Sequence, residues 1–237
     1  MLNDPHFKVL KYEPDSDKVF PGLSSPIKGG IAITYRDDDK EFGPIIAFAQ
    51  FPEVNDIARK VTNNKDFVSL SEIVYSRTAY RLTDKMHQDY PDALSKLSKG
   101  HVYDMASNIF ERLPEIFSDE MPQNGNYVKI LGRDGSKRTY KYIKREYVND
   151  VENMEYFKVL VPQANGNGTF GETISQPVIE EPKVGNTETF ISMGKFDTRI
   201  EAEALCKYIS TKFARTLLGV LKVPQNGNKP VWRMIPL

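Results

Sequence analysis

Residues 127–145 read YVKILGRDGSKRTYKYIKR, and this stretch carries the clearest fold signal of the chain. Two runs that alternate apolar and polar residues, Tyr127–Leu131 and Thr139–Lys144, flank the segment Gly132–Gly135. Alternation with a period of two is typical of a half-buried strand, and an Asp-Gly pair is a strong signal for a tight turn. The sequence therefore predicts a β-hairpin at this place.

The predicted hairpin is strongly basic. It contains seven lysine and arginine residues, while Asp134 is its one acidic residue. Because alternate residues of a strand share a face, Thr139, Lys141 and Ile143 should lie on one side. The opposite side should carry Arg138, Tyr140, Tyr142 and Lys144. A basic hairpin with interleaved tyrosines favours an anionic partner such as DNA, and an ordinary solvated sheet face is the alternative.

Outward from the hairpin, the chain is predicted to mix strands and helices in an α+β fold. Strands are expected at 7–12, 31–35, 45–49, 68–75 and 156–161, and the second and third are expected to pair. Helices are expected at 52–61, 83–97 and 198–222, with Pro91 placed awkwardly in the second. Thr198 and Glu201 form a capping box at the start of the third. Residues 163–186, rich in Gly, Asn and Pro, should form a long loop.

The composition limits the classes of protein to which the chain can belong. The 237 residues include 32 Lys plus Arg and 32 Asp plus Glu, so the zero net charge excludes a strongly basic nucleic-acid coat. The single cysteine, Cys206, excludes an internal disulfide framework and suits a reducing cytoplasm. No secretory signal and no apolar run of about 20 residues is present, so a soluble cytoplasmic protein without a membrane partner is expected.

Catalytic patterns are missing from the sequence or lack their structural context. There is no Gly-x-Ser-x-Gly elbow, no Gly-Lys-Ser phosphate loop and no His-Glu-x-x-His pair. Asp15, Asp38 and Lys40 imitate the spaced carboxylates and lysine of magnesium-dependent nucleases. Asp38 and Lys40 fall in a predicted exposed turn, so a polar turn is the main interpretation and a magnesium-dependent DNA endonuclease is the alternative function.

Short segments along the whole chain resemble segments of a known family, and they occur in the same order. The chain resembles the C-terminal part of type II restriction–modification enzymes of the fused adenine-specific DNA methyltransferase type. The N-terminal segments, similar to the last strands of the methyltransferase domain, are residues 3–9, 17–21 and 27–35. Those similar to the target recognition region are residues 107–114, 158–162, 164–166, 187–190, 208–215 and 231–237.

The resemblance implies that DNA recognition and catalysis lie in different domains. Residues 1–50 are expected to be a strand-rich tail of, or link to, a methyltransferase domain, and residues 51–237 a DNA target recognition domain. The family's catalytic tetrapeptide and its methyl-donor glycine motif are absent, so this chain is expected to be non-catalytic and part of a longer enzyme. The resemblance implies S-adenosylmethionine and magnesium for that parent enzyme, and no cofactor is expected in this chain.

Double-stranded DNA is the expected ligand, and a methyltransferase domain, with a nuclease domain in some members, is the expected partner in the same or a separate chain. A detached specificity subunit that docks on a methyltransferase is the third possibility. Arginine and asparagine suit base edges, and lysine suits phosphates. The expected DNA contacts are Lys28, Arg77, Arg138, Lys141, Lys144, Arg145, Asn165, Lys212 and Arg215.

Overall fold

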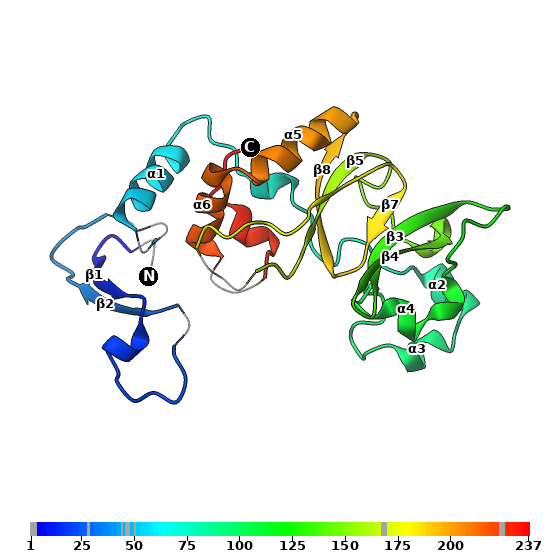
Figure 1. Ribbon diagram of the computed structural model, residues 1–237, viewed down its shortest axis with the longest axis horizontal. Helices are drawn as coiled ribbons and strands as arrows, with labels where there is room; N and C mark the ends of the chain where they lie inside the picture. The colour runs from blue at the N-terminus through cyan, green and yellow to red at the C-terminus, as the bar shows by residue number, and fades with distance from the viewer. Residues whose placement is uncertain are drawn as a thin grey trace.

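The computed structural model describes residues 4–27, 29–43, 45, 48–49, 51–166, 170–222 and 226–237. Helices and strands are mixed along this part of the chain, so the predicted α+β class is correct. Figure 1 shows an elongated arrangement. A small N-terminal hairpin lies at one end, a sheet with two long helices lies in the middle, and a second sheet with short helices forms the other end.

The strands form three small sheets. Their bounds are β1 (Phe7–Glu13), β2 (Ile31–Arg36), β3 (Tyr127–Asp134), β4 (Lys137–Lys144), β5 (Phe157–Pro162), β6 (Val178–Glu180), β7 (Val184–Asn186) and β8 (Phe190–Phe196). Strand β1 pairs with β2, and the other two sheets have the orders β4-β3-β7 and β6-β5-β8. Only the β3–β7 contact is parallel among these pairs of described strands.

The predicted β3–β4 hairpin is confirmed, with Arg133 opposite Arg138 next to its turn. The predicted orientation of β4 is also confirmed, because Ile143 is fully buried whereas Arg138 and Tyr140 on the other face are exposed. Gly132 is required by packing, since a Cβ atom there would lie 2.6 Å from the ring of Phe110. The hairpin is therefore fixed by its turn and by the core beneath it.

Short helices cover the buried face of the β4-β3-β7 sheet. They are α2 (Asp84–Asp89), α3 (Ala93–Lys96) and α4 (Ile109–Arg112). Met86, Ile109 and Leu113 pack with Ile130 and Ile143 of the hairpin in one apolar core. The predicted single helix over 83–97 is wrong, because Pro91 lies between α2 and α3 and cannot donate a backbone hydrogen bond.

Two longer helices follow the β6-β5-β8 sheet in sequence; α5 packs along the sheet, and α6 packs beside α5 and the C-terminal segment (Figure 1). They are α5 (Arg199–Ile209) and α6 (Lys212–Leu221). The capping box of Thr198 and Glu201 is confirmed, but the predicted single helix 198–222 is in fact two helices. Thr211 accepts a hydrogen bond from the backbone of Ala214 at 3.2 Å, and so caps a new helix where the first one ends.

The C-terminal segment closes this second core. Trp232 is buried, and its indole N–H donates to the carbonyl of Gly227 at 2.8 Å. The backbone of Leu70 donates to Ile235 at 2.7 Å, which ties the end of the chain to residues 68–71. Residues 68–75 therefore form a 3-10 turn, Leu70–Ile73, inside this contact and not the predicted strand.

The N-terminal sheet differs from its prediction in pairing. Strand β2 pairs with β1 and not with residues 45–49, of which 46 and 47 lie outside the described residues. Helix α1 (Pro52–Thr62) follows, and Val54 packs with Ala49 and Val220. Leu10, Ile33 and Tyr35 of the hairpin are exposed by 56%, 49% and 39%, so its apolar side chains are largely uncovered. No helix of the described residues is long and apolar enough to cross a membrane.

Candidate functional site

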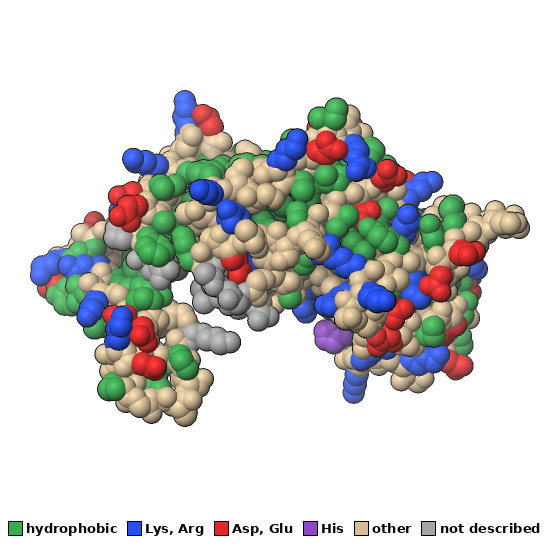
Figure 2. Space-filling view, in the orientation of Figure 1, with side chains coloured by type: hydrophobic (Ala, Val, Ile, Leu, Met, Phe, Trp, Pro, Cys, Tyr) green, Lys and Arg blue, Asp and Glu red, His purple; other side chains and the backbone are tan. Residues whose placement is uncertain are grey.

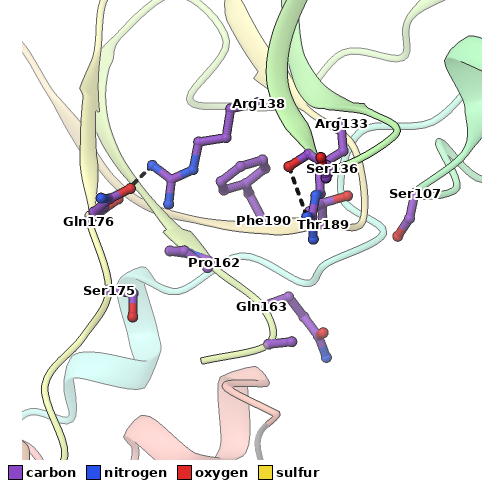
Figure 3. A pocket seen from close by; sticks show the side chains of 11 residues that line it. Ser107, Arg133, Ser136, Arg138, Pro162, Gln163, Ser175, Gln176, Thr189 and Phe190 are labelled. Carbon is purple, nitrogen blue, oxygen red and sulfur yellow. Dashed lines mark hydrogen bonds between the residues drawn. The ribbon is translucent and has the colours of Figure 1, made fainter. Parts of the chain in front are cut away.

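A cavity of about 480 Å³ lies between the turn of the β3–β4 hairpin and the segment that follows β5 (Figure 3). The start of β8 closes it at Thr189 and Phe190. We call it the hairpin cavity, and its lining residues are Ser107, Arg133, Ser136, Arg138, Pro162, Gln163, Ala164, Ser175, Gln176, Thr189 and Phe190. The cavity thus joins five stretches of the sequence, at residues 107, 133–138, 162–164, 175–176 and 189–190.

The lining of the hairpin cavity combines cations with neutral hydrogen-bonding groups. Arg133 and Arg138 supply guanidinium groups, Gln163 and Gln176 supply amides, and the rest of the polar lining is hydroxyl groups. None of the described residues around the cavity is aspartate or glutamate. Like charges directly opposite each other on paired strands are destabilising, yet Arg133 and Arg138 hold such positions. This arrangement suits a ligand that carries negative charge or acceptor atoms.

Arg138 is held in place on two sides. One guanidinium N–H donates to the carbonyl of Gln176 at 2.9 Å, and the guanidinium carbon lies 5.3 Å from the centre of the Phe190 ring. Figure 3 shows this hydrogen bond as a bridge from the hairpin to the opposite wall of the cavity. Gln176 has a positive φ of 43°, which is uncommon for a residue other than glycine. The bond to Arg138 therefore stabilises an uncommon backbone conformation.

Several predicted DNA contacts instead organise the loop that forms one wall of the cavity. Asn165 is 5% exposed, donates to the carbonyl of Thr173 at 3.0 Å and accepts from the backbone of Ser175 at 2.6 Å. Arg215 donates to the carbonyl of Gly171 at 3.0 Å. Both amide ends of Asn165 are thus engaged by the loop backbone. The structure does bring Arg138, Asn165 and Arg215 together, because all three form hydrogen bonds with residues 171–176.

Lys222 completes the support of this loop. The side chain is buried, and its ammonium group donates to the carbonyl of Asn165 at 2.8 Å and pairs with Glu172. A buried lysine is costly unless it is paired and hydrogen-bonded, so these contacts offset the loss of hydration. The loop that borders the hairpin cavity is therefore anchored from helix α6 as well as from the hairpin.

The other predicted hairpin contacts lie away from the cavity. The ammonium group of Lys141 pairs with Asp119 at 2.7 Å on the core-facing side of β4. Lys144 donates to the hydroxyl of Tyr147 at 3.3 Å, and Arg145 pairs with Asp150 at 2.8 Å. Lys144 and Arg145 line a separate cavity of about 650 Å³. Arg138 and Lys144 lie six positions apart on β4, about 20 Å of extended strand, and line different cavities.

The remaining predicted contacts are dispersed. Lys212 is exposed in the first turn of α6, and Arg77 is exposed near the C-terminal segment. Lys28 lies outside the described residues. Figure 2 shows lysine and arginine side chains beside aspartate and glutamate over much of the visible face. The cations of that face therefore alternate with carboxylates and do not form a continuous basic coat.

The residues of the alternative nuclease site have separate structural partners. Asp15 accepts from the backbone of Asp17 at 3.1 Å and begins a 3-10 turn. Asp38 pairs with Arg36, and Lys40 pairs with Asp37 at 3.0 Å. Among the described residues, no group of three or more His, Cys, Asp or Glu side chains is arranged to hold a metal ion. No contact between Asp15 and the Asp38–Lys40 turn supports the nuclease interpretation.

A buried ionisable group lies on β5 beneath the β6 edge. Lys158 is fully buried, and its ammonium group donates to the carbonyls of Met154 at 3.2 Å and Val184 at 2.8 Å. Burial lowers the pKa of Lys158 to about 8. The nearby Glu180 accepts from the hydroxyl of Tyr140, and burial raises the pKa of both of these groups.

The lowered pKa of Lys158 predicts a pH dependence of stability. Between pH 8 and 10.5 the unfolded lysine keeps a proton that the folded lysine releases, so stability rises with pH. The expected gain is about 2 kcal/mol between pH 8 and 10. The measurement is urea unfolding across that range, for the wild type and for Lys158→Met, in which this gain should vanish. Above pH 10 the raised pKa of the buried Tyr80 acts in the opposite direction. Equal slopes for the two proteins would contradict the assignment.

Sequence reasoning missed part of the lining. Gln163, Gln176, Ser107 and Phe190 were not predicted as site residues, and no local pattern marks them. Their one sequence signal is position, since Gln163 begins and Gln176 lies within residues 163–186, which the sequence predicts as a long loop and in which the structure places the short strands β6 and β7. Comparison with protein families, with curated proteins and with solved structures finds no match for this chain.

Proposed function

We propose that this chain is a sequence-specific DNA recognition module of a restriction–modification enzyme. The observation that carries the proposal is the hairpin cavity, where two arginines and two glutamines meet without a described carboxylate. Guanidinium and amide groups are planar and donate in pairs, which is the geometry that reads guanine and adenine edges in the major groove. A two-stranded ribbon such as β3–β4 fits the width of that groove.

Within this proposal the two arginines have different roles. Arg133 is exposed beside the turn, and its guanidinium donates to the carbonyl of Ser136 at 3.0 Å, which orients it along the cavity wall. Arg138 is stacked on Phe190 and bonded to Gln176, and a guanidinium has five N–H groups, so donors remain for a base. Preorganised donors lose less conformational entropy when they bind, which favours sequence discrimination.

The proposal includes a catalytic partner. The resemblance to fused adenine-specific methyltransferases implies a methyltransferase domain, and in some members a nuclease domain, in the same or a separate chain. S-adenosylmethionine and magnesium belong to that partner, which acts on DNA in the bacterial cytoplasm. The β1–β2 hairpin supports this part, because an isolated two-stranded sheet is marginally stable in water and its apolar side chains are exposed. A neighbouring domain packed on this hairpin would bury these exposed apolar side chains.

Selection from a pool of random DNA duplexes tests the proposed function. The wild-type chain is expected to enrich one short sequence motif. Arg133→Ala should lose preference at a single base pair of that motif, at a cost of about 1–3 kcal/mol. Lys137→Ala is the matched control, because Lys137 is an exposed cation on the same hairpin and does not line the cavity. A wild-type chain that binds no duplex, or that enriches no motif, would refute the proposal.

A further inference from the structure

A second hollow lies beside the C-terminal segment. Its volume is about 540 Å³, and it is formed by the turn at residues 71–77 and by residues 228–233. Three of its lining residues are cations, Arg77, Lys229 and Arg233, and all three are exposed. Ser71, Ser76 and Asn228 supply the neutral polar groups. We call it the basic hollow, and none of the described residues that line it is acidic.

The two walls of the basic hollow are fixed by backbone contacts. The hydroxyl of Ser69 donates to the carbonyl of Arg233 at 3.0 Å, and Leu70 donates to Ile235. The buried Trp232 anchors the segment between Lys229 and Arg233 in the apolar core. The fold therefore holds the backbone positions of three cations around one hollow before any ligand arrives.

The charges of the basic hollow lack compensation in the protein. Among the described residues, no hydrogen bond or ion pair engages the charged groups of Arg77, Lys229 and Arg233. By contrast, Arg81 and Arg145 pair with Asp104 and Asp150. Three neighbouring cations repel one another, and an anion bound between them would remove that repulsion.

We propose that the basic hollow binds the phosphodiester backbone of DNA, as a sequence-independent contact next to the base-reading hairpin cavity. This inference rests on the proposed function. Lysine and arginine neutralise phosphates, and such contacts fix the register of a protein on the duplex without reading its sequence. Serine and asparagine side chains donate to the same oxygens.

The position of the basic hollow relative to the hairpin cavity supports one continuous DNA surface. Gln163 lines the hairpin cavity, and its amide donates to the side-chain oxygen of Asn228 at 3.3 Å. Asn228 lines the basic hollow. Ala164 is bridged to Asn226, and Gly227 donates to the carbonyl of Gln163 at 2.7 Å. The two sites are therefore neighbours in the fold, linked by the Gln163–Asn228 hydrogen bond, and in this inference one duplex contacts both.

The test measures binding of a fluorescent mixed-sequence 30-base-pair duplex by anisotropy from 50 to 200 mM KCl. The variant combines Arg77→Ala, Lys229→Ala and Arg233→Ala. Its salt slope should fall by about two to three units relative to the wild type, because each lost phosphate contact removes about 0.9 units. Its affinity at 0.1 M salt should fall about a hundredfold for the same reason.

The matched control combines Lys65→Ala, Lys99→Ala and Lys207→Ala, which removes three exposed cations from other places. It should retain the wild-type slope. If the wild type binds the duplex and the basic-hollow variant keeps its slope, the inference is wrong while the proposed function stands. If the wild type binds no duplex, both are wrong.

A second measurement uses the unaltered chain and does not depend on the folding of a variant. Acetylation of lysines with and without the same duplex, read by mass spectrometry, should show protection of Lys229. Lys65 and Lys99 should react equally in both samples. Equal acetylation of Lys229 with and without DNA would overturn the assignment.

Discussion

Replacing Asn153 by leucine is expected to lower the free energy of unfolding by about 3–5 kcal/mol. Asn153 is fully buried, and its amide oxygen accepts from the hydroxyl of Tyr80 at 2.6 Å. Its amide nitrogen donates to the hydroxyl of Ser192 at 2.6 Å and to the carbonyl of Gly194 at 3.1 Å. Leucine has a similar volume but leaves these buried polar groups without a partner, and each costs about 1–3 kcal/mol.

Chemical denaturation of graded variants measures this effect. Tyr80→Phe removes one hydroxyl and should cost about 1 kcal/mol. Asn108→Leu is the control, because Asn108 is exposed and its side chain makes no capping hydrogen bond at the start of α4, so its effect should stay within about 0.5 kcal/mol. An Asn153→Leu variant as stable as the control would show that the network contributes little.

Replacing Arg138 by alanine is expected to weaken binding to the selected DNA motif by about 2–3 kcal/mol, roughly 30- to 150-fold. The substitution removes a base-reading guanidinium, its stacking on Phe190 and the hydrogen bond that holds Gln176 in its positive-φ conformation. Because these three losses act on one site, Arg138→Ala should lose more binding free energy for the motif than Arg133→Ala.

Arg138→Lys separates charge from geometry. A lysine retains the positive charge, so binding to mixed-sequence DNA and its salt slope should stay near the wild type. It lacks the planar fork, so the preference for the selected motif should be lost. Competition binding with motif and mixed-sequence duplexes measures both quantities. If Arg138→Lys keeps the full preference for the motif, then Arg138 does not read a base.

Local signals predicted local structure well. The alternation and the Asp-Gly turn identified β3–β4, and the Thr198–Glu201 pair identified the start of α5. The break between α5 and α6 was missed because the apolar stripe continues through it. In the structure, α5 ends at Ile209 and the hydrogen bond from the backbone of Ala214 to Thr211 begins a second helix.

The candidate site was predicted only in part, for a physical reason. A sequence shows that Arg138, Asn165 and Arg215 are polar, but the partner of each is chosen by contacts between segments distant along the chain. In the fold, Asn165 bonds its own loop and Arg215 bonds the same loop from α6. In the basic hollow, Arg77 is likewise 152 positions from Lys229 and 156 from Arg233 along the chain. Long-range pairing of the C-terminus with residues 68–70 brings them together.

The N-terminal sheet has a consequence for the behaviour of the chain in concentrated solution. With two strands only, β1 and β2 each leave one row of backbone donors and acceptors unpaired within the described sheet. Open edges of this kind template pairing with another molecule, and cationic side chains along an edge oppose it by mutual repulsion. Lys8 and Lys11 lie on β1, whereas Arg36 at the end of β2 is paired with Asp4 and Asp38. Colloidal stability of the isolated chain thus depends on few charges and falls as added salt screens them.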